Sequence, residues 1–151
     1  MAKGYKGVLL YELQQPAPAE VLLTEALAGP GENPAPFHYT LARCYGRLER
    51  YSQALEQVEE ALAKEPENGV FLYAKAQLLA DLDQVDDALL VLGESIKVWP
   101  TNPDAWLVLA RAQLNLNEPA DAVKNLEEGL KHNPNHPELR ESLANASLGA
   151  G

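Results

Sequence analysis

Residues 103–136 read PDAWLVLARAQLNLNEPADAVKNLEEGLKHNPNH, and this stretch decides the fold. Its last proline, Pro134, is separated from Pro100 by the same interval that separates Pro100 from Pro66. A fixed interval of about 34 residues is typical of proteins built from repeated supersecondary units that bury a shared core. The prolines therefore indicate a repeat, although eleven of them in 151 residues would otherwise count against a helical protein.

Two preceding segments of equal length, 35–68 and 69–102, align with residues 103–136 position by position. All three carry small residues and large apolar residues at the same places. The small residues are Ala42, Ala76, Ala110, Ala54, Ala88 and Ala122. The large apolar residues are Val58, Leu92, Leu126, Leu62, Ile96 and Leu130. Agreement at so many positions with one period indicates true internal repetition.

Within each segment, apolar residues recur at spacings of three and four, as in Phe71, Ala74 and Leu78. This period is that of an amphipathic helix. Short, mainly polar stretches such as Asp81–Gln84 and Asn115–Glu118 divide each segment into two helices. Each segment is predicted to be a helical hairpin, in which the small alanines let the paired helices approach to about 8–10 Å.

This pattern resembles the tetratricopeptide repeat, a helical hairpin of the same length. The last segment is the most similar one, through Trp106, Leu109, Ala110, Ala122, Leu126 and Pro134. The middle segment departs from the family at Lys75, where leucine is usual, and at Ser95, where alanine is usual. The resemblance covers residues 35–136 and implies an all-α, right-handed solenoid of antiparallel helix hairpins.

The beginning of the chain follows the same plan less clearly. Residues 1–34 align as a degenerate hairpin if the linker that follows contains one extra residue. Its helices are predicted over Tyr5–Gln14 and Pro18–Ala28. The alternative is a single amphipathic helix over 18–28 behind a frayed leader.

The end of the chain is predicted to close the array. A helix over 137–148 mixes apolar residues with an outer polar face, as the terminal cap of a solenoid requires. The final residues, from Leu148 to Gly151, carry no pattern and are expected to fray. The whole chain, 1–151, is thus predicted to be a single domain.

Charge and composition limit the classes of partner and the compartment. The chain has 12 basic and 22 acidic residues, and this net charge of −10 disfavours binding to nucleic acids or anionic membranes. The lone Cys44 cannot form an internal disulfide, which favours a reducing compartment. The longest early apolar run, Val8–Tyr11, is too short for a signal peptide or a membrane span. We expect a cytoplasmic protein, or a periplasmic one if a signal or anchor was removed, and no direct membrane insertion.

The sequence offers no catalytic or metal-binding constellation. His132 and His136 are separated by a proline-containing turn, and His38 falls at a packing position. Cys44 is expected to be a semi-buried thiol, although Arg43 beside it could lower its pKa. No glycine-rich phosphate loop or nucleophile elbow occurs. We therefore predict that the protein is not an enzyme and has no catalytic residues, metal or cofactor.

The resemblance implies that the first helices of successive repeats line a concave groove. It assigns seven inward positions to Tyr39, Arg43, Tyr73, Gln77, Leu107, Arg111 and Asn115. Tyrosine offers flat apolar area, amides can bond a peptide backbone, and arginine can pair with carboxylates. The alternative for each residue is an ordinary solvated side chain between core positions.

One branch of the family clamps the terminal carboxylate of chaperone tails with lysine, asparagine and arginine at set inward positions. Here those places hold Tyr39, Arg43, Ala74, Asp104 and Val108. The clamp is therefore absent, and the chain is not assigned to that branch.

We predict a non-catalytic interaction module that binds a peptide or helix of a partner protein in its groove. An alternative is a structural unit that self-associates into a homo-oligomer through an end of the solenoid. Four apolar residues in the weak first repeat motivate it, namely Leu9, Leu10, Tyr11 and Leu13. A further alternative is the repeat part of a bacterial secretion, pilus or polysaccharide-export system. This last one rests on analogy, because a fold does not determine a function.

Overall fold

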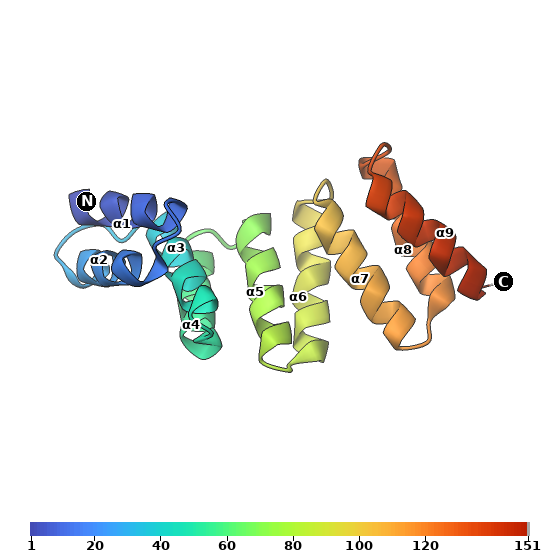
Figure 1. Ribbon diagram of the computed structural model, residues 1–151, viewed down its shortest axis with the longest axis horizontal. Coiled ribbons are helices and arrows are strands. Elements are labelled where there is room, and N and C mark those ends of the chain that lie inside the picture. The colour runs from blue at the N-terminus through green and yellow to red at the C-terminus, as the bar shows by residue number, and fades with distance from the viewer. Residues whose placement is uncertain (151) are drawn as a thin grey trace. The chain divides into compact units, whose positions relative to one another are not determined.

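The computed structural model describes residues 1–150, and this part of the chain is all-α, as predicted (Figure 1). Its helices are α1 (Ala2–Glu12), α2 (Pro16–Ala28), α3 (Ala35–Arg47), α4 (Tyr51–Lys64), α5 (Gly69–Asp81), α6 (Val85–Val98), α7 (Pro103–Asn115), α8 (Pro119–His132) and α9 (Pro137–Ala150). None of these helices is long and apolar enough to cross a membrane.

Prolines and asparagines set where many of these helices begin. Pro16, Pro103 and Pro119 stand in the first turn of α2, α7 and α8, where no backbone N–H is needed for the helix. The side chains of Asn68 and Asn102 cap α5 and α7 by accepting backbone N–H groups of the first turn. The eleven prolines are thus compatible with a helical chain because several of them start helices.

The helical hairpins turn at residues with left-handed backbone geometry. These residues are Gln14, Glu49, Asp83 and Asn117, with φ of 62°, 58°, 62° and 61°. The last three recur at the period of the repeats, and Gln14 precedes Glu49 by one residue more, which is the extra linker residue that the alignment required. The chain from α1 to α2 is therefore a hairpin of the repeat type, and not a single helix behind a frayed leader.

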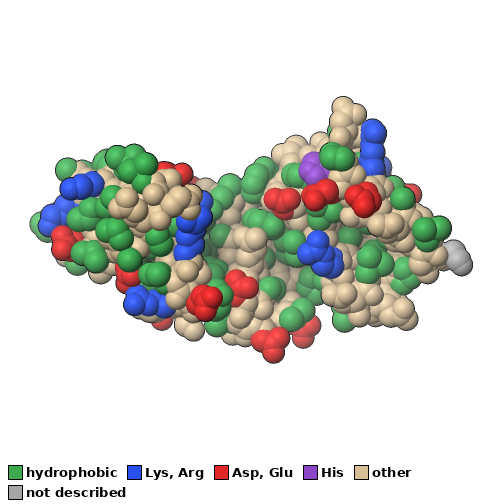
Figure 2. Space-filling model, in the orientation of Figure 1, with side chains coloured by type: hydrophobic (Ala, Val, Ile, Leu, Met, Phe, Trp, Pro, Cys, Tyr) green, Lys and Arg blue, Asp and Glu red, His purple; other side chains and the backbone are tan. Residues whose placement is uncertain are grey.

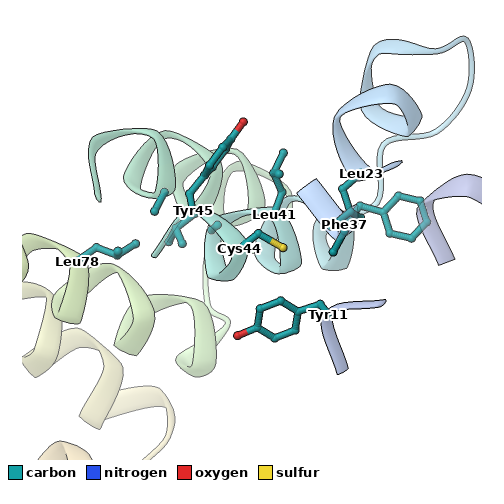
Figure 3. Close-up of a cluster of buried hydrophobic side chains, with 11 residues drawn as sticks. Tyr11, Leu23, Phe37, Leu41, Cys44, Tyr45 and Leu78 are labelled. Atoms are coloured by element: carbon teal, nitrogen blue, oxygen red, sulfur yellow. The ribbon is translucent and has the colours of Figure 1, made fainter. Parts of the chain in front are cut away.

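The chain divides into two compact units, 1–91 and 92–151, with the boundary inside α6. In the first unit, α1 packs mainly on α2 and α3 mainly on α4. The core of this unit is shown in Figure 3 and contains Tyr11, Ala19, Leu23, Phe37, Leu41, Ala42, Cys44, Tyr45, Ala54, Val58 and Leu78. Gly7 lies so close to Leu23 that an added Cβ would be 2.7 Å from its Cγ. A small residue at this position lets α1 and α2 pack closely.

In the second unit, α8 packs against both α7 and α9. Trp106 is buried, and its indole N–H donates to the backbone oxygen of Pro100 at 2.7 Å. Gly129 of α8 faces the indole, since an added Cβ would be 2.7 Å from Trp106 Cγ. Leu139 of α9 is fully buried, so α9 covers the apolar side of α8.

Several predicted helix ends differ from the observed ones. Helix α1 begins and ends earlier than Tyr5–Gln14, and α2 begins at Pro16 instead of Pro18. Helix α9 continues to Ala150, so residues 148–150 are helical where fraying was expected. Leucine and alanine favour helix, and the single Gly149 next to the end of α9 does not interrupt it. Gly151, also expected to fray, lies outside the described residues.

Candidate partner-binding surface

The histidines, which often act in catalysis, make contacts typical of structural residues in this protein. His38 is buried, and its Nδ1 lies 2.9 Å from the amide oxygen of Gln57. His132 ends α8, whereas His136 precedes α9 and accepts the backbone N–H of Leu139. No group of three or more His, Cys, Asp or Glu side chains within residues 1–150 could hold a metal ion.

Cys44 is a core residue with no exposed surface. Burial and the nearby Glu20 carboxylate raise the pKa of its thiol to about 11. Arg43 and Arg47 act in the opposite direction but are outweighed. The thiol is therefore more deeply buried than expected, and it is protonated at neutral pH.

The seven predicted groove residues lie on the first helices of three repeats. Tyr39 and Arg43 lie on α3, Tyr73 and Gln77 lie on α5, and Leu107, Arg111 and Asn115 lie on α7. The two tyrosines and Leu107 are half-buried, while the other four residues are exposed. The first four belong to the first compact unit and the last three to the second.

Tyr39 and Arg43 form part of one connected cluster. The Tyr39 ring packs on Phe71 of α5, with ring centroids 4.8 Å apart. The Arg43 guanidinium carbon lies 5.7 Å from the Tyr39 ring centroid. Burial raises the pKa of the Tyr39 hydroxyl, and the charge of Arg43 partly offsets this. The Tyr39 hydroxyl is thus neutral at physiological pH, and its ring is held against α5.

Helix α1 and the turn after it contribute three residues to this cluster that the sequence did not assign to the groove. Arg43 lies 4.5 Å from the Tyr11 ring centroid and 3.5 Å from a carboxylate oxygen of Glu12. Arg47 lies 5.2 Å from the same ring and donates to the side-chain oxygen of Gln14. The sequence does contain one signal, because Arg43 and Arg47 are four residues apart and share a face of α3.

In the second unit, three candidate residues share one face of α7. Leu107, Arg111 and Asn115 are four residues apart along this helix. Among the ion pairs of the described residues, none includes Arg111. Its guanidinium is therefore available to a carboxylate from outside the chain.

The surface of the first unit also exposes apolar side chains (Figure 2). Along α1 and its C-cap, Met1, Tyr5, Leu9 and Leu13 are 62%, 62%, 59% and 59% exposed. Their spacing of four residues aligns them as a stripe along the helix. Leu10 is half-buried and Tyr11 is buried, so only two of the four apolar residues named from the sequence lie in this stripe.

Two family models and several solved structures are similar to the chain. A tetratricopeptide repeat model matches residues 79–146. A model described as anaphase-promoting complex, cyclosome, subunit 3, also of the tetratricopeptide type, matches residues 12–95, more than half of the chain. No curated protein matches the sequence significantly.

The similar solved structures include a tetratricopeptide repeat protein from Parabacteroides merdae ATCC 43184 (TM-score 0.84, 19% identity, 99% of this chain and 59% of that one). MamA AMB-1 in a P212121 crystal has a TM-score of 0.77 and 19% identity, with 96% of this chain and 79% of that one covered. Another MamA crystal structure has a TM-score of 0.82 and 16% identity, with 96% and 84% covered. At these identities the likeness concerns the fold. The family models show that the chain belongs to the tetratricopeptide repeat family, a family of protein–protein interaction modules.

Proposed function

We propose that this protein is a non-catalytic module that binds a peptide or helix of a partner protein along the first helices of its repeats. The binding residues are Tyr39, Arg43, Tyr73, Gln77, Leu107, Arg111 and Asn115. The observation that carries the proposal is the contrast between two sets of positions on the same helices. The small positions that the repeats share, Ala42, Ala76 and Ala110, are buried in the core, whereas these seven keep exposed or half-buried side chains.

The chemistry of these side chains suits a polypeptide. Tyr39 supplies a flat ring, Gln77 and Asn115 can bond backbone amides, and Arg43 and Arg111 can bind carboxylates. Family membership supports the same conclusion, since tetratricopeptide repeats are generally interaction modules without catalysis.

The test is partner capture by a triple variant, Arg43→Ala, Tyr73→Ala and Arg111→Ala, compared with the unchanged chain. The control is Lys64→Ala, Leu90→Ala and Lys124→Ala, which truncates two cations and one large side chain at positions of α4, α6 and α8 outside the groove set. Pull-downs read by quantitative mass spectrometry should lose the partner with the first variant only.

Circular dichroism and the thermal midpoint must show that both variants fold. If the triple variant does not fold, the double variant Arg43→Ala and Arg111→Ala replaces it, since both arginines are exposed. Undiminished capture by a folded variant would defeat the groove assignment.

A second candidate function is self-association through α1, favoured by the stripe of Met1, Tyr5, Leu9 and Leu13. A second copy that covers these four side chains would remove apolar surface from water. Sedimentation velocity should then show a dimer whose fraction grows with concentration and is lost in Leu9→Glu with Leu13→Glu. A strict monomer at high concentration removes this candidate.

A further inference from the structure

One part of the first unit carries a charge opposite to that of the whole chain. The chain has a net charge of −10 and only five arginines, yet three of these, Arg43, Arg47 and Arg50, lie close together in sequence. They occupy the second half of α3 and the turn after it. Such a concentration in an acidic protein indicates a local role for positive charge.

Two of these guanidinium groups converge on one aromatic ring. The guanidinium carbons of Arg43 and Arg47 lie 4.5 and 5.2 Å from the centroid of Tyr11. A guanidinium within about 6 Å of a tyrosine ring is attracted to it, which restrains both side chains. Restrained arginines lose less conformational entropy when they bind a ligand.

The charges of this cluster do not balance. The two arginines face a single carboxylate, that of Glu12, because the other partner, Gln14, is neutral. The cluster of Tyr11, Glu12, Gln14, Arg43 and Arg47 therefore carries one net positive charge. By contrast, Arg50 pairs with Glu20 at 2.6 Å, and Lys75 pairs with Glu59 at 2.9 Å.

The existing carboxylate is also loosely held. The distance between Glu12 and Arg43 is 3.5 Å, longer than the 2.7–2.9 Å or so of a charge-assisted hydrogen bond. The Glu12 side chain is 62% exposed and that of Arg43 is 43% exposed. A carboxylate from outside can therefore reach the arginines and replace Glu12.

We propose that Arg43 and Arg47, restrained on the Tyr11 ring, form a carboxylate-binding site for acidic side chains of a partner peptide, with Glu12 as its internal competitor. This inference rests on the proposed function and adds the chemical class of the partner, an acidic segment. It uses residues of α1 and α3 together, and three of them, Tyr11, Glu12 and Arg47, lie outside the predicted groove set.

The cluster fits an acidic peptide better than a nucleic acid. Single strands bind to proteins through exposed aromatic faces as well as positive charge. Here the Tyr11 ring is covered by guanidinium groups and the Tyr39 ring packs on Phe71. The net charge of −10 also repels a long polyanion more than a short acidic segment.

The first experiment maps binding by NMR on the full chain. The arginine Nε–Hε signals are followed during titration with the peptide acetyl-Gly-Ser-Glu-Glu-Leu-Glu-Glu-Leu-Gly-Ser-amide. We expect saturable shifts of the Arg43 and Arg47 signals, and none with the analogue in which glutamine replaces every glutamate. Equal binding of the two peptides, or absence of shifts at these arginines, overturns the proposal.

The second experiment compares charge variants by the dissociation constant of the same peptide. Arg43→Gln and Arg47→Gln should each weaken binding about tenfold or more, since a hydrogen bond to a charged group is lost. Arg50→Gln is the matched control and should leave the dissociation constant unchanged, because Arg50 is already paired with Glu20.

Glu12→Gln distinguishes a binding site from a merely structural cluster. It removes the competitor, so binding should tighten about two- to fivefold, which corresponds to one exposed ion pair. Unchanged or weaker binding contradicts the proposal. A titration with oligothymidylate provides the remaining test, since tighter binding of this probe at Arg43 and Arg47 would assign the site to nucleic acid instead.

Failure of this inference can be told apart from failure of the proposed function. In one outcome, the triple variant with Arg43, Tyr73 and Arg111 replaced loses its partner, but Arg43→Gln and Arg47→Gln leave the dissociation constant of the glutamate peptide unchanged. Only the carboxylate site is then overturned. If Arg43→Gln and Arg47→Gln weaken binding of the glutamate peptide but the triple variant captures its partner undiminished, the groove assignment fails. The two arginines then bind carboxylates without contributing to the capture of that partner.

Discussion

Three glycines occupy positions where a neighbouring side chain leaves no room for a methyl group. Gly4 faces the ring of Phe37, Gly7 faces Leu23, and Gly129 faces the indole of Trp106. All three lie inside helices, where glycine is ordinarily unfavourable relative to alanine. Close helix packing in both compact units therefore depends on residues that weaken the helices themselves.

Gly129→Ala should destabilise the protein by about 1–3 kcal/mol, because the new Cβ would be 2.7 Å from Trp106 Cγ and the buried ring cannot move freely. Urea unfolding followed by tryptophan fluorescence measures the change. The matched control is Gly93→Ala in α6, where an added Cβ meets nothing within 4 Å. It should stabilise the protein by about 0.5–1 kcal/mol. Equal effects at the two sites would contradict the packing argument.

The Cys44 thiol should make stability fall at alkaline pH. Its pKa is 9.0 when unperturbed and is raised to about 11 in the folded protein. Between these two pKa values, only the unfolded state releases the thiol proton. The contribution of the thiol to the free energy of unfolding is therefore complete below pH 9 and is lost as the pH rises towards about 11. The stability advantage over Cys44→Ala, measured by urea unfolding, should shrink by about 2 kcal/mol across this range. A constant difference would contradict a buried neutral thiol.

At the scale of elements, the turn inside each hairpin depends on one residue with left-handed backbone geometry. Gln14, Glu49, Asp83 and Asn117 occupy this place, and none of them is glycine. A glycine recurring at this place would have revealed the turns directly. These four residues share only a carboxylate or an amide side chain, and such side chains are common elsewhere in the sequence. The apolar spacing predicted the helices well, but their ends shifted by a few residues, because caps and turns depend on local backbone geometry.

Glu49→Gly should stabilise the protein by about 0.5–1 kcal/mol, since a residue with a Cβ is strained at the φ of 58° found there. Thermal or urea unfolding provides the measurement. Glu56→Gly is the control, because Glu56 is exposed in the interior of α4 and glycine there should cost about 1 kcal/mol. A loss of stability at both sites would show that Glu49 is not strained.

At the scale of the whole molecule, repeat proteins are held together by contacts between neighbouring helices. The core of each compact unit is built mainly from residues close in sequence, as in the packing of α3 on α4 and of α8 on α9. Stability in such a chain need not be uniform, because each part can open without the others.

Leu126→Ala should therefore loosen the second unit more than the first. Leu126 is fully buried, and its truncation should cost about 2–5 kcal/mol locally. Hydrogen exchange read by mass spectrometry should accelerate over α7–α9 and change little over α1–α3. The reciprocal variant Leu23→Ala should show the opposite pattern. Uniform acceleration in both variants would indicate one cooperative unit.

The sequence alone determined the repeat period, the helical hairpins and the family, because these follow from the spacing of apolar and small residues along the chain. It also identified Tyr39, Arg43 and Arg111 as candidate binding residues. Only the tertiary structure placed Tyr11 and Glu12 beside Arg43, since these side chains come from α1 in a degenerate repeat and meet α3 through packing. Periodicity is carried by near neighbours in sequence, whereas the positively charged cluster depends on which side chains two distant helices bring together.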